Sequence, residues 1–384
     1  GGGGAGAGGG GGGAIDDDAP GLAGDWDDAE GYYAFRAGEA LGPGGRYKVV
    51  HALGRGVFSS VLKALDARGG DRPVALKVIR ANDLMATAGQ KELSILKQLA
   101  KTDPEGKRHC VRAWDSFEFR GHLVLALEAL HLNFRKLVRQ HGGGQGISLR
   151  AVRSFSKQLM IALKHIHKNE FVHADLKPDN MIVNSDLNIL KVCDFGSAYR
   201  LHETEELNRT QYVCSRFYRA PEICLGYPPK GPPMDVWSAA CSLFEMYTGK
   251  VLITGRTNNH IVRNIIDLRG PIPRKLIKQA HFRDLYYDGN FSYMYQHISK
   301  KKNEDGENIV TIKTIPNLTA TKDLWDLLLP PKAAKKANQA LRTQLGLFQN
   351  FLEKCLDVDP SKRLTAAQAL KHAFIKREVH GAEC

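Results

Sequence analysis

The amino-acid sequence predicts an α+β fold with two lobes, in which a small β-rich lobe precedes a larger helical lobe. Apolar residues alternate around glycines between residues 47 and 65, which is typical of two strands joined by a tight turn. After about Leu130 the apolar spacing becomes that of amphipathic helices. Because this change falls at one place in the chain, we expect the lobes to meet there with a ligand cleft between them.

The small lobe is expected to hold further strands and a single helix. Strands are predicted over residues 73–80 and 122–130, where aliphatic residues dominate. Residues 91–100 have helical spacing, because three leucines fall on one face. We therefore place this lobe at about residues 47–128.

The helical lobe is expected at about residues 133–376, after a hinge at residues 128–132 and before a tail at 377–384. Its apolar stripes repeat at helical spacing. The helices predicted from these stripes cover residues 133–140, 149–169, 235–248 and 341–357.

An insertion at about residues 270–340 interrupts the helical lobe. Apolar and polar residues alternate over residues 292–298 and again over 309–315, which predicts a surface hairpin. Three lysines at 300–302 occupy the connection. They indicate a solvated loop, with a docking site as the alternative.

The first 46 residues are predicted to be a disordered extension. Residues 1–14 are nearly pure glycine, and two acidic clusters follow, so little apolar surface is available for burial. A solvated tail is the expectation. Tyr32, Tyr33 and Phe35 offer an alternative, in which they tether the segment to the folded body.

Composition and charge narrow the class of protein. The 384 residues are 43% hydrophobic and carry a formal net charge of +13. Acidic or phosphate-bearing partners, nucleic acid or a merely solvated basic surface would each fit this charge. No aromatic-basic strand pair for base stacking accompanies it, so we expect no sequence-specific nucleic-acid binding.

The cysteines and the apolar runs indicate a reducing compartment and no membrane partner. Seven cysteines are scattered without the C-x-x-C spacing of zinc sites, which is typical of free thiols. Cys193 is interpreted as a small packing residue. No stretch resembles a signal peptide or a spanning helix.

One pair of motifs carries most of the functional information. Residues 173–180 have the sequence His-Ala-Asp-Leu-Lys-Pro-Asp-Asn, and Asp194-Phe195-Gly196 follows a short strand later. Asp175 can accept a proton from a hydroxyl group, while Asn180 and Asp194 can hold Mg²⁺ on a nucleotide triphosphate. The spacing therefore predicts phosphoryl transfer.

A glycine-rich turn precedes these motifs. Its glycines allow the backbone to approach phosphate oxygens, although Ser59 stands where a third glycine is usual. Lys77, in Val-Ala-Leu-Lys, would grip the phosphates, and Glu92 on the next helix would hold Lys77. A plain hairpin and two surface charges are the alternatives. The nucleotide-contacting residues expected on the turn are Leu53, Gly54, Arg55, Gly56, Val57, Phe58, Ser59 and Val61.

Together these motifs and Ala220-Pro221-Glu222 resemble those of the eukaryotic protein kinases, over about residues 47–374. The resemblance implies the bilobal kinase fold, ATP and Mg²⁺ as cofactors, and protein substrates. It also implies that adenine lies among apolar side chains beside a hinge that offers backbone hydrogen bonds. The residues concerned are Val61, Ala75 and Ile182 around adenine, Leu127 as gatekeeper, and Glu128 and Leu130 in the hinge.

Further roles follow from the same resemblance. Lys177, two residues after Asp175, is typical of serine/threonine kinases and would neutralise the transferring phosphoryl group. Glu222 would pair with Arg363 to brace the substrate-binding segment. Asp235 would anchor the central helix, together with a neighbouring tryptophan.

Residues 215–222 and the insertion are similar to the CMGC group, in which Arg219 would favour proline after the target residue. Residues 25–33, 212–218 and 248–260 resemble the family of pre-mRNA-processing-factor-four kinases. That family implies splicing proteins as substrates, spliceosomal partners and a nuclear location, with the cytoplasm as a second one. We also expect a monomer.

Ala174 stands where most regulated kinases have an arginine that binds a phosphorylated activation loop. The hypothesis is that Tyr212 is phosphorylated in cis and then pairs with Arg216 and Arg219. Tyr212 as a packing residue is the alternative.

Two other classes of protein compete with an active kinase. A non-catalytic pseudokinase scaffold would require loss of Lys77, Asp175 or Asp194, and all three are present. A basic RNA-associated module would draw on the charge of +13.

Overall fold

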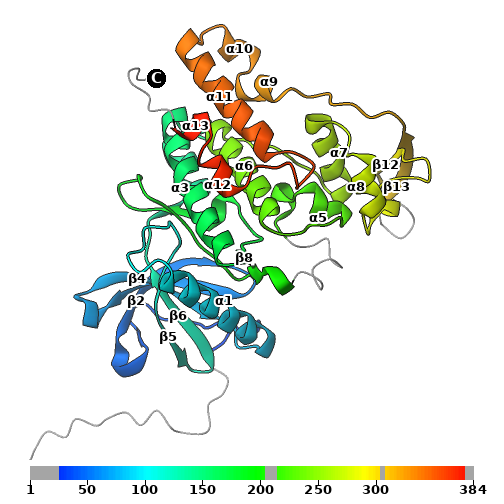
Figure 1. Ribbon diagram of the computed structural model, residues 1–384. Helices are drawn as coiled ribbons and strands as arrows, with labels where there is room; N and C mark the ends of the chain where they lie inside the picture. The colour runs from blue at the N-terminus through cyan, green and yellow to red at the C-terminus, as the bar shows by residue number, and fades with distance from the viewer. Residues whose placement is uncertain (1–25, 204–213, 303–307, 377–384) are drawn as a thin grey trace, which may run out of the picture.

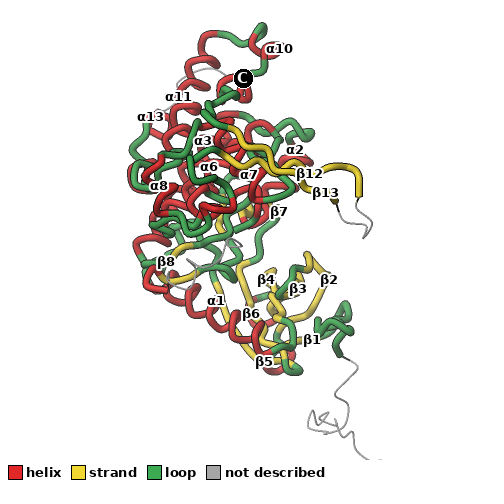
Figure 2. The backbone as a smooth tube through the Cα atoms, turned by 90° about the vertical axis from the view of Figure 1, so that its right-hand side faces the viewer, coloured by secondary structure: helices red, strands yellow, loops and turns green. Residues whose placement is uncertain are grey.

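The computed structural model describes residues 26–203, 214–302 and 308–376, and it confirms the expected α+β fold with two lobes. Figure 1 shows a curled sheet with one long helix below a larger helical body. Figure 2 shows the same division from the side, with strands β1 to β6 and helix α1 in one lobe and most of the helices in the other.

The small lobe is built on a six-stranded antiparallel sheet with the order β1-β2-β3-β4-β6-β5. β4 lies inside this sheet and pairs with β3 and β6, so its backbone position is fixed on both sides. The strands are β1 (Ala40–Leu41), β2 (Tyr47–Arg55), β3 (Ser59–Asp66), β4 (Arg72–Ile79), β5 (Ala113–Phe119) and β6 (His122–Glu128).

Helix α1 (Asp83–Lys101) packs against β4, β5 and β6. Asn82 caps it, accepting hydrogen bonds from the backbone N–H groups of the first turn. At Gly89 a Cβ atom would lie 3.0 Å from both Ile79 and Leu123, so the absence of a side chain permits the close approach of α1 to the sheet. The helix is thereby held at a fixed distance from β4.

Most of the helical lobe surrounds α6, which has few exposed residues over its length. Helices α3, α9 and α11 contact it. The helices of this lobe are α2 (Phe134–His141), α3 (Leu149–Lys168), α5 (Pro221–Leu225), α6 (Pro232–Thr248), α7 (Asn258–Arg269), α8 (Arg274–Gln279), α9 (Leu324–Leu328), α10 (Pro331–Ala334), α11 (Gln339–Cys355), α12 (Ala366–Ala369) and α13 (Ala373–Lys376).

Short strands and 3-10 turns make up the rest of the regular structure. β10, β9 and β7 form one sheet, while β11 pairs with β8. The elements are β7 (Leu132–Asn133), β8 (Phe171–Val172), β9 (Met181–Val183), β10 (Leu190–Val192), β11 (Tyr199–Arg200), η1 (Pro43–Gly45), η2 (Ala67–Gly69), η3 (Pro178–Asn180), η4 (Leu201–Glu203), η5 (Arg216–Tyr218) and η6 (Arg283–Leu285).

The surface hairpin predicted in the insertion is present. β12 (Tyr293–Lys302) pairs antiparallel with β13 (Asn308–Ile315), and Tyr293 lies opposite Ile315. β13 is exposed over almost its whole length. The hairpin is attached to α7, because Asn259 donates to Met294 O and accepts from Gln296 N.

Residues 26–46 do not form the disordered extension that their composition suggested. Tyr33 and Leu41 lie in the apolar core of the small lobe, and β1 adds to its sheet. Asp27 Oδ1 lies 2.7 Å from His122 Nε2, and the Arg120 guanidinium lies 3.6 Å from the centre of the Trp26 ring. Burial of aromatic side chains therefore stabilises this segment in spite of its acidic composition. This agrees with the alternative interpretation, in which aromatic residues tether the segment to the folded body.

The starts of two helices and the presence of one strand also differ from the sequence prediction. α1 begins eight residues before residue 91, because Asn82 supplies a capping side chain there. α6 begins before residue 235, since prolines are tolerated in the first helical turn. Strand β5 was not predicted, because its apolar residues are interrupted by Asp115 and Glu118.

The N-terminal segment also reaches the glycine-rich turn between β2 and β3. The hydroxyl group of Tyr32 donates to the carbonyl oxygens of Gly56 and Val57, at 2.9 and 3.0 Å. The guanidinium of Arg55 stacks on the Tyr32 ring at 3.6 Å and bonds Asp28. The turn is therefore held from outside the cleft.

Replacing Tyr32 by Phe should loosen this turn. One lost hydrogen bond corresponds to about 1 kcal/mol, so amide hydrogen exchange at residues 56–59 should become about fivefold faster. Tyr33→Phe is the matched control, because its hydroxyl group bonds Glu39 instead. Equal exchange at the turn in wild type and Tyr32→Phe would contradict this role for Tyr32.

Candidate active site

Three charged residues from separate elements meet on the floor of the cleft. The ammonium of Lys77, on β4, lies 2.8 and 2.7 Å from the two carboxylate oxygens of Glu92 on α1. It also lies 2.9 Å from Asp194 Oδ1 in the helical lobe. Glu92 Oε1 accepts a further hydrogen bond from the backbone N–H of Phe195. Lys77 therefore connects the two lobes.

The electrostatics favour the charged form of Lys77. Burial opposes its charge, but Glu92 and Asp194 together outweigh burial and raise the pKa of the ammonium above its usual value. Burial also opposes the charge of Asp194, but Lys77 more than compensates and lowers its pKa. For Glu92 burial prevails and raises the pKa.

Asp235 on α6 holds the segment that begins at His173. Its side chain is 1% exposed and accepts hydrogen bonds from the backbone N–H groups of His173 and Ala174, both at 2.9 Å. His167 Nε2 lies 3.0 Å from the same carboxylate. Ala174 has a φ of +66°, a conformation that is costly for a residue with a side chain. The buried carboxylate stabilises this backbone.

Asp175 lies at the next position and is fixed from three sides. Its Oδ1 accepts hydrogen bonds from the backbone N–H and the hydroxyl group of Ser215, at 2.9 and 2.7 Å. Its Oδ2 lies 2.6 Å from the Lys177 ammonium. Asn180 donates to the Asp175 carbonyl oxygen at 2.9 Å. A carboxylate oriented in this way can accept a proton from a hydroxyl group in the cleft.

The apolar residues expected around adenine come from both lobes. Val61 and Ala75 lie on adjacent strands of the small lobe, and Ile182 lies on β9 of the helical lobe. Ala75 faces Leu127 across the β4–β6 pair, and both side chains are buried. The three side chains are thus supplied by strands on both sides of the cleft.

One backbone group of the expected hinge residues already has a partner within the chain. The backbone N–H of Glu128 already donates to Arg112 O at 2.8 Å, so it is not available to a ligand. The Glu128 side chain pairs with Lys191 at 2.7 Å. On the described part of the chain, no backbone acceptor receives the N–H of Leu130.

The glycine-rich turn is open to solvent at its tip. Val57 and Phe58 are among its exposed residues, and Leu53 is exposed on the preceding strand. Ser59, which replaces a glycine, is 5% exposed and begins β3. Its side chain is therefore packed inside the lobe.

Glu222 and Arg363 form a fully buried ion pair in the helical lobe. Two guanidinium nitrogens lie 2.6 and 2.9 Å from the two carboxylate oxygens, and both side chains are 0% exposed. Arg363 also donates to the backbone oxygens of Pro233 and Asp357. The pair ties α5 to the C-terminal part of the lobe.

The sequence matches the family described as protein kinase domain over residues 47–375. The chain belongs to the protein kinase family. The kinase is 38% identical to serine/threonine-protein kinase prpf4B of Dictyostelium discoideum, over 92% of this chain and 42% of that relative. It is 39% identical to serine/threonine-protein kinase prp4 of Schizosaccharomyces pombe, over 91% of this chain and 70% of that relative.

A second set of relatives is more distant. Dual specificity tyrosine-phosphorylation-regulated kinase 3 of Homo sapiens is 33% identical over 93% of this chain and 58% of that relative. These matches confirm the resemblance to the pre-mRNA-processing-factor-four kinases, and they identify the chain as a serine/threonine protein kinase. The chain spans less than half the length of the Dictyostelium relative.

The kinase offers two side chains for a metal ion. The amide nitrogen of Asn180 donates to Asp175, which leaves its carbonyl oxygen as a potential ligand. Asp194 bonds Lys77 through Oδ1, and its side chain is 46% exposed. Mg²⁺ takes one or two protein oxygens plus phosphates and water, so this donor set fits Mg²⁺. Within the described residues no cluster of three or more His, Cys, Asp or Glu residues could hold a metal.

Of the three residues expected in the activation loop, the structure describes Arg216 and Arg219. Tyr212 lies outside the described residues. Arg216 is exposed on η5, whereas Arg219 is 6% exposed and donates to Cys214 O and to Asn258. Arg219 therefore shapes the backbone of its own segment.

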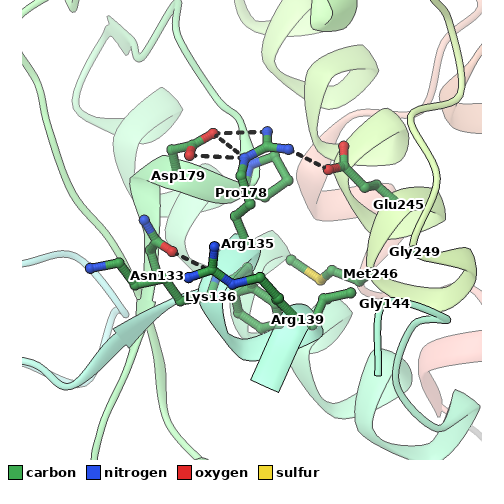
Figure 3. Close-up of a pocket in the computed structure, with 12 residues that line it drawn as sticks. Asn133, Arg135, Lys136, Arg139, Gly144, Pro178, Asp179, Glu245, Met246 and Gly249 are labelled. Carbon is green, nitrogen blue, oxygen red and sulfur yellow. Dashed lines mark hydrogen bonds and ion pairs between the residues drawn. The ribbon is translucent and has the colours of Figure 1, made fainter. Parts of the chain in front are cut away.

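One network near the cleft was missed by sequence reasoning. Arg135, on α2, bonds Asp179 within the motif of residues 173–180 and Glu245 at the end of α6, as Figure 3 shows. It also bonds the hydroxyl group of Tyr218. No motif marks this arginine, because it lies in a run of basic helical residues.

No described helix is long and apolar enough to span a membrane.

Replacing Asp235 by Asn should destabilise the backbone conformation at His173 and Ala174. One accepting oxygen becomes a donating group against a backbone N–H, at a cost of about 1–3 kcal/mol of unfolding free energy. We expect a lower melting temperature and a loss of turnover of about tenfold or more. Thermal unfolding and steady-state assays would measure both.

Asp323→Asn is the matched control, because Asn replaces Asp as a helix cap with little cost. Wild-type turnover and stability in Asp235→Asn would show that this carboxylate does not support the catalytic segment.

Proposed function

We propose that the kinase transfers the γ-phosphoryl group of ATP directly to serine or threonine hydroxyl groups of proteins, with Asp175 as the residue that orients and deprotonates the hydroxyl group. The arrangement around Asp175 carries this proposal, because Lys177 and Ser215 fix its carboxylate in the cleft. Phosphoryl transfer depends mainly on positioning and on charge neutralisation, and both are supplied here.

The remaining residues have supporting roles in the proposed mechanism. Lys77 and Lys177 neutralise phosphate charge, and the glycine-rich turn at residues 54–59 covers the phosphates. Asn180 and Asp194 would hold Mg²⁺, which neutralises developing charge when bound. Because Glu92 holds Lys77, the ammonium is positioned before a substrate arrives.

We further propose that the target residue is followed by proline. Arg219 donates two hydrogen bonds to Cys214 O, which gives residues 214–219 a fixed backbone shape beside Asp175. Such a shape can exclude an N–H group, and proline is the residue that lacks one. The resemblance to the CMGC group supports the same preference.

The biological setting is proposed from the same resemblance. Similarity to the pre-mRNA-processing-factor-four kinases supports splicing proteins as substrates, spliceosomal proteins as partners and a nuclear location. A pseudokinase scaffold is not favoured, because Lys77, Asp175 and Asp194 are all present; Lys77 pairs with Asp194, and Lys177 pairs with Asp175.

A peptide library of serine and threonine followed by varied residues tests the proposal. Wild type should favour proline after the target, and Asp175→Asn should lower turnover by about a thousandfold while Mg·ATP affinity stays near wild type. Exposed Asp186→Asn is the control. Near-normal turnover in Asp175→Asn would exclude Asp175 as the base.

A second proposal concerns activation. We propose that Tyr212 is phosphorylated in cis, which is supported by the exposed Arg216 nearby in sequence and by relatives named as tyrosine-phosphorylation-regulated kinases. Protein made in bacteria should carry phosphate at Tyr212, and Asp175→Asn protein should not. Peptide mapping by mass spectrometry decides it, and a fully active kinase with unmodified Tyr212 would contradict the proposal.

A further inference from the structure

A cavity of about 430 Å³ lies beside the catalytic segment and outside the proposed nucleotide site. We name it the α2 pocket. Figure 3 shows that its lining comes from α2, from η3 and from the end of α6. The lining residues that matter here are Arg135, Lys136, Arg139, Asp179, Glu245 and Met246.

Arg135 forms ion pairs with both acidic side chains of this pocket, Asp179 and Glu245. Its guanidinium bonds Asp179 through Nε and Nη2, at 2.9–3.0 Å, and bonds Glu245 Oε1 through Nη1 at 2.9 Å. Tyr218 accepts from the same guanidinium at 2.9 Å and donates to Glu245 Oε2 at 2.6 Å. The carboxylates raise the pKa of Arg135, chiefly through the hydrogen bonds of Asp179. Each carboxylate is thus neutralised by the chain itself.

The pocket lies next to the groups that fix the Asp175 carboxylate. Asp179 follows Lys177 by two residues, and Tyr218 follows Ser215 by three residues. Both Lys177 and Ser215 hydrogen-bond the Asp175 carboxylate. Arg135 therefore bridges the two segments on either side of Asp175. An extended peptide advances about 3.3 Å per residue, so a side chain a few positions from the target can reach the pocket.

Two further basic side chains give the lining of the pocket a net positive charge. Lys136 and Arg139 are exposed at its rim. No ion pair of either side chain occurs among the residues that the structure describes. With three basic and two acidic side chains in the lining, and both acidic ones already paired, the cations at the rim can attract an anion.

We propose that the α2 pocket is a substrate-specificity site, which accepts an anionic side chain of the substrate near the target residue and excludes a basic one. The inference rests on the proposed protein-kinase activity and adds a substrate class to it. Lys136 and Arg139 supply the attraction. Arg135 supplies the exclusion, because it covers the carboxylates that a substrate arginine would otherwise bind. A carboxylate and a phosphate would both meet this requirement.

The test scans the residues that flank a Ser-Pro target. Peptides carry Ala, Glu, phosphoserine or Arg at one position at a time, and kcat/KM is measured for each. Wild type should favour Glu or phosphoserine over Ala by about fivefold at one position, and should disfavour Arg there. The two anions distinguish a carboxylate pocket from a phosphate pocket. If wild type phosphorylates no peptide, the proposed function fails, whereas activity without this preference overturns only the pocket.

Variants assign the effect to individual residues. Arg135→Ala uncovers Asp179 and Glu245, so the preference at that position should reverse towards Arg, and adding Glu245→Gln should weaken the reversal. Lys136→Ala with Arg139→Ala keeps the Arg135 network, and it should lose the anion preference while still disfavouring Arg. Exposed Arg150→Ala is the matched control and should match wild type.

Three results would overturn the proposal. One is an unchanged preference in active Arg135→Ala. Another is an unchanged anion preference in the Lys136→Ala, Arg139→Ala variant, which covers the case in which Arg135→Ala does not fold. The third is an unstructured RNA that binds wild type but not this double variant, with peptide preferences unaffected, because the pocket would then serve nucleic-acid phosphates.

Discussion

The contact of one ammonium with two carboxylates determines how the lobes of this kinase meet. Lys77 comes from the middle of a sheet, Glu92 from the helix packed on it, and Asp194 from the other lobe. Lys77 and Glu92 are nearly inaccessible to water, so a displaced partner would leave an uncompensated buried charge. This cost disfavours other positions of α1 and of the segment at Asp194. The proposed nucleotide site between the lobes depends on that restriction.

In the helical lobe, a buried carboxylate also fixes the backbone near residues 173–180. Asp235 holds a backbone with positive φ through two N–H groups, and Glu222 forms a fully buried pair with Arg363. Asp175 then needs only local contacts from Lys177 and Ser215. These buried charges are therefore placed where a segment must keep one conformation, and the charged residues of the α2 pocket extend the pattern towards the proposed substrate site.

The sequence predicted those features of the fold and of the site that depend on short motifs and on local residue spacing. Glycine spacing, the alternation in β12 and β13, and the residues of the Lys77 and Asp175 motifs were all visible in the chain. Residues 26–46 were mistaken for a disordered segment, because their burial depends on Tyr33 reaching a core formed by distant strands. Arg135 was missed for a similar reason, since its three partners lie 44 to 110 residues away in sequence. Tertiary contacts at that separation leave no local periodicity.

A double-mutant cycle on Lys77 and Glu92 tests most directly whether the central ion pair positions the phosphates. Single-turnover rates of phosphoryl transfer are measured for wild type, Lys77→Met, Glu92→Gln and the double variant. If Glu92 acts through Lys77, Glu92→Gln slows wild type by about tenfold or more and has no further effect in Lys77→Met. Equal, multiplicative effects of Glu92→Gln in both backgrounds would contradict this account.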